Sequence, residues 1–143
     1  MNMEHNVERV LVVEDDMALR PLWSHLFESK FDRIAVEWTV SCEEAIKMIQ
    51  LANVNKNPYG LIITDIFLAG SKTGLDLINS EEVIISGAQT VLVSSVDSRE
   101  IVKKFSDLIP ETVILSKPFD LRKYELILRD LLLKNNNLVL CAA

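Results

Sequence analysis

Short runs of β-branched and other aliphatic residues alternate along the chain with longer stretches in which apolar residues recur every three or four positions. The short runs predict five strands, near residues 8–13, 33–38, 60–65, 90–94 and 112–115. Their continuous apolar character is typical of strands that are buried on both faces of a parallel sheet. The longer stretches between them predict the helices that cover those faces.

Five apolar stripes predict these helices. The stripes consist of Leu19, Leu22, Trp23, Leu26 and Phe27; of Ala45, Met48, Ile49 and Ala52; of Leu75 and Ile78; of Ile101, Val102, Phe105 and Leu108; and of apolar positions within 121–133. Ser41, with Glu44 three residues later, forms a capping box that opens the second helix. Pro21 leaves two possibilities for the first helix: a distorted first turn capped by Asp16, or a regular helix that begins near Arg20.

The order of the elements predicts an α/β fold with five β-then-α units. Right-handed crossovers would arrange these units as an open, doubly wound parallel sheet. The chain has 143 residues and no internal repeat, so we expect one domain over 1–143, with a core at about 8–134 and a short tail at 135–143. In such sheets, ligands bind at the carboxyl ends of the strands, beside the switch in strand order.

Composition and charge argue against several classes of protein, including nucleic-acid-binding and membrane-spanning proteins. The formal net charge is −6, and no basic cluster is larger than a pair, so direct binding to nucleic acid is not expected. No apolar stretch approaches the roughly 18 residues of a membrane span, and the N-terminus lacks the pattern of a signal peptide. Cys42 and Cys141 are far apart, which favours reduced thiols in a cytoplasmic protein but leaves a disulfide open.

Chemically useful side chains follow four of the predicted strands. Glu14 and Asp15 follow the first strand, Asp65 ends the third, Ser95 follows the fourth, and Lys117 follows the fifth. Each motif alone is more often a solvated loop, a cap or a turn. Their shared position at one edge of the sheet favours a common site.

The expected site combines three carboxylates with a hydroxyl and an ammonium. Converging carboxylates repel one another unless a positive charge joins them. Mg²⁺ suits this role, because it prefers oxygen ligands and commonly shares carboxylates with a phosphate. A carboxylate can also act as a nucleophile and form an aspartyl phosphate. The residues therefore predict a site where a phosphoryl group and Mg²⁺ meet.

These motifs resemble those of receiver domains in two-component response regulators. The matching segments are Val-Leu-Val-Val-Glu-Asp-Asp at 10–16, Ile-Ile-Thr-Asp at 62–65, Val-Leu-Val-Ser-Ser at 91–95 and Leu-Ser-Lys-Pro-Phe at 115–119. The resemblance covers about residues 8–134. It implies a flavodoxin-like, five-stranded parallel sheet in the order 2-1-3-4-5, with five helices.

The resemblance also implies roles for individual residues. Asp65 would accept the phosphoryl group, Ser95 would supply the switch hydroxyl, and Lys117 would contact the phosphate. Asp15 and Asp65 would bind Mg²⁺ directly, Glu14 would act through water, and the backbone carbonyl of Phe67 would complete the protein ligands.

The implied partners are other signalling proteins. A sensor histidine kinase or a histidine phosphotransfer protein would donate the phosphoryl group. Phosphorylation would then repack the face formed by the helix at 101–108, the strand at 112–115 and the helix at 121–133, which would contact a downstream protein or a second copy. The chain would catalyse only its own phosphorylation and dephosphorylation, and would be no conventional enzyme.

Apolar positions in the helix at 121–133 leave one question open. Leu121, Tyr124, Leu128, Leu131 and Leu132 form one stripe, whereas Leu126, Ile127 and Leu133 lie outside it. These extra positions indicate either a broad core face or a surface for a partner.

Three features depart from the pattern of the family. The loop at 68–74 is one residue longer than usual, Val96 replaces a small residue, and Ile114 stands where many members have Tyr or Phe. Phe67 and Asp97 line the expected route of the attacking water, where Phe67 could shield the phosphoryl group. The longer loop, Val96 and Ile114 favour an alternative hypothesis, a pseudo-receiver that binds partners without phosphorylation. A flavin site or a phosphatase of the haloacid dehalogenase type is not expected, because the first strand ends in Glu-Asp-Asp and Asp65 lacks a second Asp at position 67.

Overall fold

Five parallel strands form a single sheet in the order β2-β1-β3-β4-β5. The computed structural model describes residues 7–95, 100 and 111–136. The strands are β1 (Glu8–Val13), β2 (Ile34–Thr39), β3 (Leu61–Asp65), β4 (Gln89–Ser94) and β5 (Val113–Ser116). Each lies within one residue of its predicted position, and the predicted fold class is confirmed.

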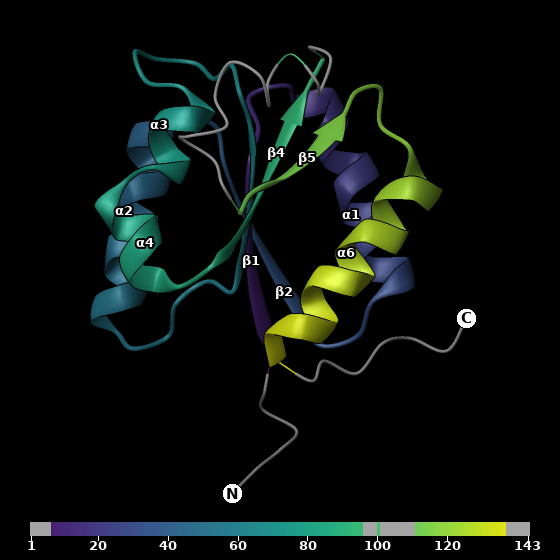
Figure 1. The fold of residues 1–143 in the computed structure, drawn as a ribbon, viewed down its shortest axis with the longest axis horizontal. Helices are drawn as coiled ribbons and strands as arrows, with labels where there is room; N and C mark the ends of the chain where they lie inside the picture. Colours follow the sequence, from purple (N-terminus) through teal and green to yellow (C-terminus); the bar gives the residue numbers. More distant parts are fainter. Residues whose placement is uncertain (1–6, 96–99, 101–110, 137–143) are drawn as a thin grey trace, which may run out of the picture.

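Helices cover both faces of this sheet (Figure 1). One face carries α1 (Arg20–Lys30) and α6 (Leu121–Asn136). The other carries α2 (Cys42–Val54), α3 (Gly74–Ile78) and α4 (Glu81–Ser86). Over the described residues, no helix is long and apolar enough to cross a membrane.

The two possibilities for the first helix both hold in part. Asp16 caps a short 3-10 turn, η2 (Met17–Leu19), and its side chain accepts a hydrogen bond from the N–H of Ala18 at 3.0 Å. The regular helix α1 then begins at Arg20, with Pro21 in its first turn. Proline is tolerated there because the first N–H groups of a helix have no intrahelical partner.

The third connection differs from the prediction of one helix around Leu75 and Ile78. It contains two short helices, α3 and α4, each with its own cap. Ser80 caps α4, and Gly87 ends it in the left-handed conformation at φ 70°. Val83 is the only buried residue of α4, so the helix has no apolar stripe that its periodicity could reveal. The helix predicted at 101–108 lies outside the described residues.

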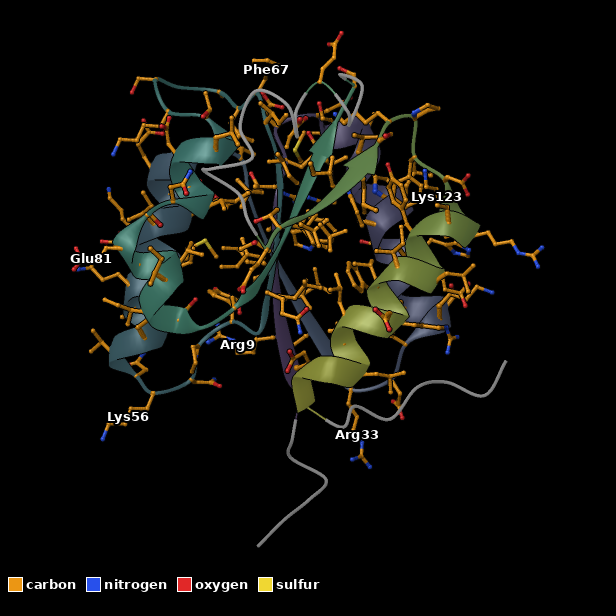
Figure 2. The ribbon with its side chains drawn as sticks, viewed as in Figure 1. Arg9, Arg33, Lys56, Phe67, Glu81 and Lys123 are labelled. Atoms are coloured by element: carbon orange, nitrogen blue, oxygen red, sulfur yellow. The ribbon has the colours of Figure 1, made fainter. Side chains whose placement is uncertain are left out.

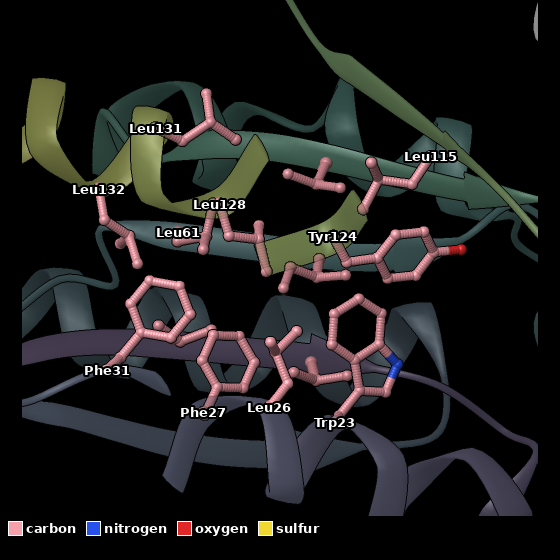
Figure 3. Close-up of a cluster of buried hydrophobic side chains, with 14 of the residues drawn as sticks. Trp23, Leu26, Phe27, Phe31, Leu61, Leu115, Tyr124, Leu128, Leu131 and Leu132 are labelled. Carbon is pink, nitrogen blue, oxygen red and sulfur yellow. The ribbon is translucent and has the colours of Figure 1, made fainter. Parts of the chain in front are cut away.

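The strands contribute alternate residues to the cores on the two faces. In β1, Val10 and Val12 pack toward α1 and α6, whereas Leu11 and Val13 pack toward α2. The core beneath α1 and α6 is rich in aromatic rings (Figure 3). Trp23 stacks on Tyr124 there, with ring centroids 5.6 Å apart.

One side of α6 fills this core and the other side faces solvent. Tyr124, Leu128, Leu131 and Leu132 are buried, and Ile127 packs against their cluster. Leu126 and Leu133 are exposed. The interpretation of a broad core face is therefore wrong for Leu126 and Leu133, although it holds for Ile127.

Candidate functional site

Three carboxylates meet at the carboxyl ends of β1 and β3. The N–H of Glu14 donates to the carbonyl of Thr39 at 2.9 Å, which extends the pairing of β1 with β2 by one residue. Asp65 is the last residue of β3. Glu14 and Asp65 are only 5% and 8% exposed, whereas Asp15 is exposed. One ligand oxygen from each lies within 4.8 Å of the other two.

Lys117 brings a positive charge to these carboxylates from the end of β5. Its N–H donates to the carbonyl of Ser94 at 2.7 Å, and the peptide bond to Pro118 is cis. Its ammonium lies 2.7 Å from Oδ2 of Asp65 and 3.9 Å from Oε1 of Glu14. Burial works to lower the pKa of Lys117, but the hydrogen bond and the attraction of both carboxylates outweigh it and raise the pKa. The ammonium is therefore charged and held against Asp65.

This arrangement raises the pKa of Glu14. Burial, reinforced by repulsion from Asp65 and Asp15, raises the pKa of Glu14 to about 7. The N–H of Asp16, which donates to Oε2 of Glu14 at 3.1 Å, and the charge of Lys117 oppose this shift only in part. A divalent cation beside Glu14 would favour its ionised form.

The donor set fits Mg²⁺. Three carboxylates at the ends of β1 and β3 offer the oxygen ligands that Mg²⁺ prefers. Because Asp15 is exposed, water can also reach a bound ion. Glu14, Asp15 and Asp65 are therefore the described residues that could hold a cation.

Phe67 lies two residues beyond Asp65 at the same edge of the sheet (Figure 2). Its side chain is 65% exposed, so most of the ring is in contact with solvent. The role of its backbone carbonyl as a metal ligand stays a prediction.

Ser95 is exposed and follows β4 directly. It lines a groove of about 570 Å³ together with Asp16, Lys117 and apolar residues of α1 and of the β5–α6 connection. The hydroxyl and the ammonium are thus brought to one groove. Val96 and Asp97 lie outside the described residues.

Gly74 is a site residue that the sequence analysis did not assign. Its N–H donates to the carbonyl of Ile66 at 2.7 Å, and a Cβ at this position would lie 1.9 Å from the carbonyl oxygen of Asp65. No larger residue fits without moving the end of β3. The capping box of Thr73 and Asp76 signals that a helix begins at this glycine, but the close approach to Asp65 is a tertiary contact that this local pattern does not signal.

The long loop before Gly74 is attached to the start of α2. Ser41, the N-cap of α2, forms an isolated parallel bridge with Ala69. The hydroxyl of Ser71 donates to Oε2 of Glu43 at 3.0 Å. These contacts attach the loop that follows Asp65 to the first turn of α2.

No protein-family model matches the chain, and no curated protein matches its sequence. Solved structures do match. The signal receiver domain of a putative Luxo repressor protein from Vibrio parahaemolyticus is 19% identical, with a TM-score of 0.74 over 90% of this chain and 92% of that one. A response regulator receiver protein from Sinorhizobium medicae WSM419 is 18% identical, with a TM-score of 0.72 over 92% and 98%. A CheY-like receiver domain from Methanospirillum hungatei JF-1 is 21% identical, with a TM-score of 0.68 over 88% and 94%.

The chain has the fold of a response-regulator receiver domain. The likeness covers about nine-tenths of the sequence. In this receiver fold, Ile114 of β5 packs with Ile78 and Leu92 on the side of the sheet that carries α3. Ile114 is therefore partly buried where the resemblance led us to expect an aromatic switch residue.

Proposed function

We propose that this receiver domain accepts a phosphoryl group on Asp65 from a phosphohistidine of a sensor kinase or phosphotransfer protein. The observation that carries this proposal is the pairing of Asp65 with Lys117 inside a cluster of carboxylates. A carboxylate oxygen of Asp65 would form the new bond to phosphorus as the bond to the histidine nitrogen breaks. The ammonium of Lys117 would then bind the oxygens of the transferred group.

The proposed metal ligands are Glu14, Asp15, Asp65 and the backbone carbonyl of Phe67. Mg²⁺ would offset the negative charge that the carboxylates and the phosphoryl oxygens bring together. Glu14 would be ionised in that state, acting through a water. The activity would be limited to the domain's own phosphorylation and dephosphorylation.

The proposed output is a contact with another protein in the cytoplasm. Ser95 would turn toward the phosphoryl group and so bias the surface formed by 101–108, β5 and α6. The exposed side chains of Leu126 and Leu133 on α6 support a partner surface there, for a downstream protein or a second copy.

The alternative is a pseudo-receiver that binds its partners without phosphorylation. The partly buried Ile114 in place of an aromatic switch and the longer loop held by Glu43 favour it. Against it stands the complete set of carboxylates, hydroxyl and ammonium at one edge of the sheet.

Intact-mass spectrometry after incubation with acetyl phosphate and Mg²⁺ distinguishes the two functions. We expect a single phosphoryl adduct that requires Mg²⁺ and is absent in Asp65→Asn. Asp32→Asn, at an exposed carboxylate in the α1–β2 connection, is the matched control and should be phosphorylated like the wild type. A folded protein that binds no Mg²⁺ and acquires no adduct would support the pseudo-receiver.

A further inference from the structure

The backbone of Phe67 is held by its neighbours and not by its own side chain. The ring is 65% exposed and projects away from the sheet (Figure 2). Before it, Ile66 is buried, and its N–H donates to the carbonyl of Val93 at 3.2 Å. After it, Leu68 packs against the hydrophobic cluster beneath α2. The position of the Phe67 carbonyl therefore depends on how firmly the loop after it is held.

Glu43 of α2 contacts this loop at two successive residues. Its Oε2 accepts a hydrogen bond from the hydroxyl of Ser71 at 3.0 Å. Its Oε1 is shielded from solvent beside Gly70, where an added Cβ would lie 3.1 Å from this oxygen. Gly70 also has a φ of 97°, a conformation that favours glycine. The loop is therefore shaped to receive the side chain of Glu43.

The acceptor in this contact is an ionised carboxylate on a firm support. Hydrogen bonds from its own N–H and from the hydroxyl of Ser71 lower the pKa of Glu43, so it is charged at neutral pH. Hydrogen bonds to charged acceptors are stronger than those between neutral groups. Glu43 lies in the first turn of α2, next to Cys42, which is fully buried in the core. The contact thus ties the loop to a helix end that the core holds in place.

We propose that Glu43 is a positioning residue for the metal site, which holds the loop through Ser71 so that the carbonyl of Phe67 is available to the cation. The inference rests on the proposed function, in which this carbonyl is a ligand of Mg²⁺. The contact restrains the extra length of the loop, which would otherwise sample more conformations. Without it, Mg²⁺ binding would have to order the loop, and the affinity would fall.

Calorimetric titration of the full chain with Mg²⁺ tests the proposal without any phosphodonor. Glu43→Ala and Ser71→Ala should each weaken Mg²⁺ binding roughly three- to tenfold, at or below the lower end of the loss that follows removal of an outer-shell partner. The double variant should lose no more than either single variant, because both remove the same contact. Glu81→Ala is the matched control: it removes an exposed acidic residue from the first turn of α4 and should bind Mg²⁺ like the wild type.

Glu43→Gln separates the hydrogen bond from the negative charge. The amide oxygen of glutamine can still accept the hydrogen bond from Ser71, so the Mg²⁺ affinity should stay within about twofold of the wild type. A loss as large as in Glu43→Ala, with wild-type affinity in Ser71→Ala, would assign the effect to charge alone. That result would overturn the positioning role.

Phosphorylation by acetyl phosphate supplies a second readout. The rate of adduct formation at saturating Mg²⁺ should be the same in Glu43→Ala and the wild type. The half-saturating Mg²⁺ concentration should rise by the factor that calorimetry gives. Urea unfolding in EDTA gives the stability of each variant. A lower free energy of unfolding with an unchanged Mg²⁺ affinity would show a purely structural contact and would overturn the proposal.

The proposed function and this inference fail in different ways. A wild type whose Mg²⁺ affinity depends on Glu43 but which forms no phosphoryl adduct would refute phosphorylation and support the positioning role. A wild type that is phosphorylated, with the same Mg²⁺ affinity in every variant, would do the reverse. A wild type that binds no Mg²⁺ would overturn both.

Discussion

Single residues at the strand ends determine the electrostatics of the candidate site. Lys117 neutralises one of three close carboxylates and holds Asp65 in place, at an N–O distance of 2.7 Å. Glu14 is buried without a full counter-charge, and its pKa rises to about 7 as a result. A site of this kind is costly when empty and favourable when a cation is bound.

The first prediction concerns the pH dependence of stability and belongs to Glu14. Because folding raises the pKa of this carboxyl from 4.5 to about 7, the folded state binds more protons than the unfolded state between these values. The free energy of unfolding should therefore fall as the pH rises through this window, by about 1–3 kcal/mol in the presence of EDTA.

Urea unfolding of the wild type and of Glu14→Gln at both ends of the window measures this effect. The variant cannot ionise at this position and should lack the decrease. Added Mg²⁺ should restore the stability of the wild type near neutral pH, since it favours the ionised carboxylate. Equal pH dependence in the two proteins would show that Glu14 does not titrate as proposed.

At the scale of elements, caps and close approaches set where the site residues lie. The capping box of Thr73 and Asp76 begins α3 immediately after the long loop. Gly74, the first residue of α3, packs directly on the carbonyl of Asp65. The position of the proposed phosphoacceptor thus depends on the junction of β3 with α3.

The second prediction compares two glycines of this region. Gly74→Ala should lower the free energy of unfolding by about 3 kcal/mol and should weaken Mg²⁺ binding, because the new methyl group displaces the end of β3. Gly87→Ala is the control: its φ is 70° but nothing lies within 4 Å of the added Cβ. It should cost only about 1 kcal/mol, from backbone strain alone.

Urea unfolding gives both free energies, and calorimetric titration with Mg²⁺ gives the affinities. Equal losses in the two variants would mean that the contact with Asp65 contributes nothing beyond the loss of a flexible residue. An unchanged Mg²⁺ affinity in Gly74→Ala would separate the β3–α3 junction from the metal site.

At the scale of the whole molecule, one sheet joins the two hydrophobic cores. Adjacent residues of β1 and β3 point to opposite faces, so Val12 and Ile63 pack with α1 and α6 while Leu11 and Ile62 pack with α2. Neither core can lose its strands without exposing the other. Cooperative unfolding follows from this sharing.

The third prediction is that both layers unfold in a single transition. Trp23 reports on the core beneath α1 and α6, whereas far-ultraviolet circular dichroism reports on helices of both layers. The two signals should give the same midpoint and the same slope in urea. A circular dichroism transition that precedes the fluorescence transition would show that the layer of α2, α3 and α4 unfolds on its own.

The sequence by itself determined the order of the strands along the chain, their burial on both faces and the set of chemical groups at one edge. These properties follow from local patterns: apolar runs specify buried strands, and a polar residue after each run must lie at a strand end. The N-cap of α2 at Ser41 was also predicted, and the cap at Asp16 was one of two possibilities, because capping is a short-range interaction.

Only the tertiary structure decided how those groups interact. The pairing of Lys117 with Asp65 joins residues 52 positions apart, and it depends on strand neighbours that local patterns do not specify. The sequence predicted one helix between β3 and β4 and not two, because α4 buries a single side chain, Val83. The exposure of Leu126 was likewise undetermined, since an apolar residue becomes core or surface only when its neighbours are in place.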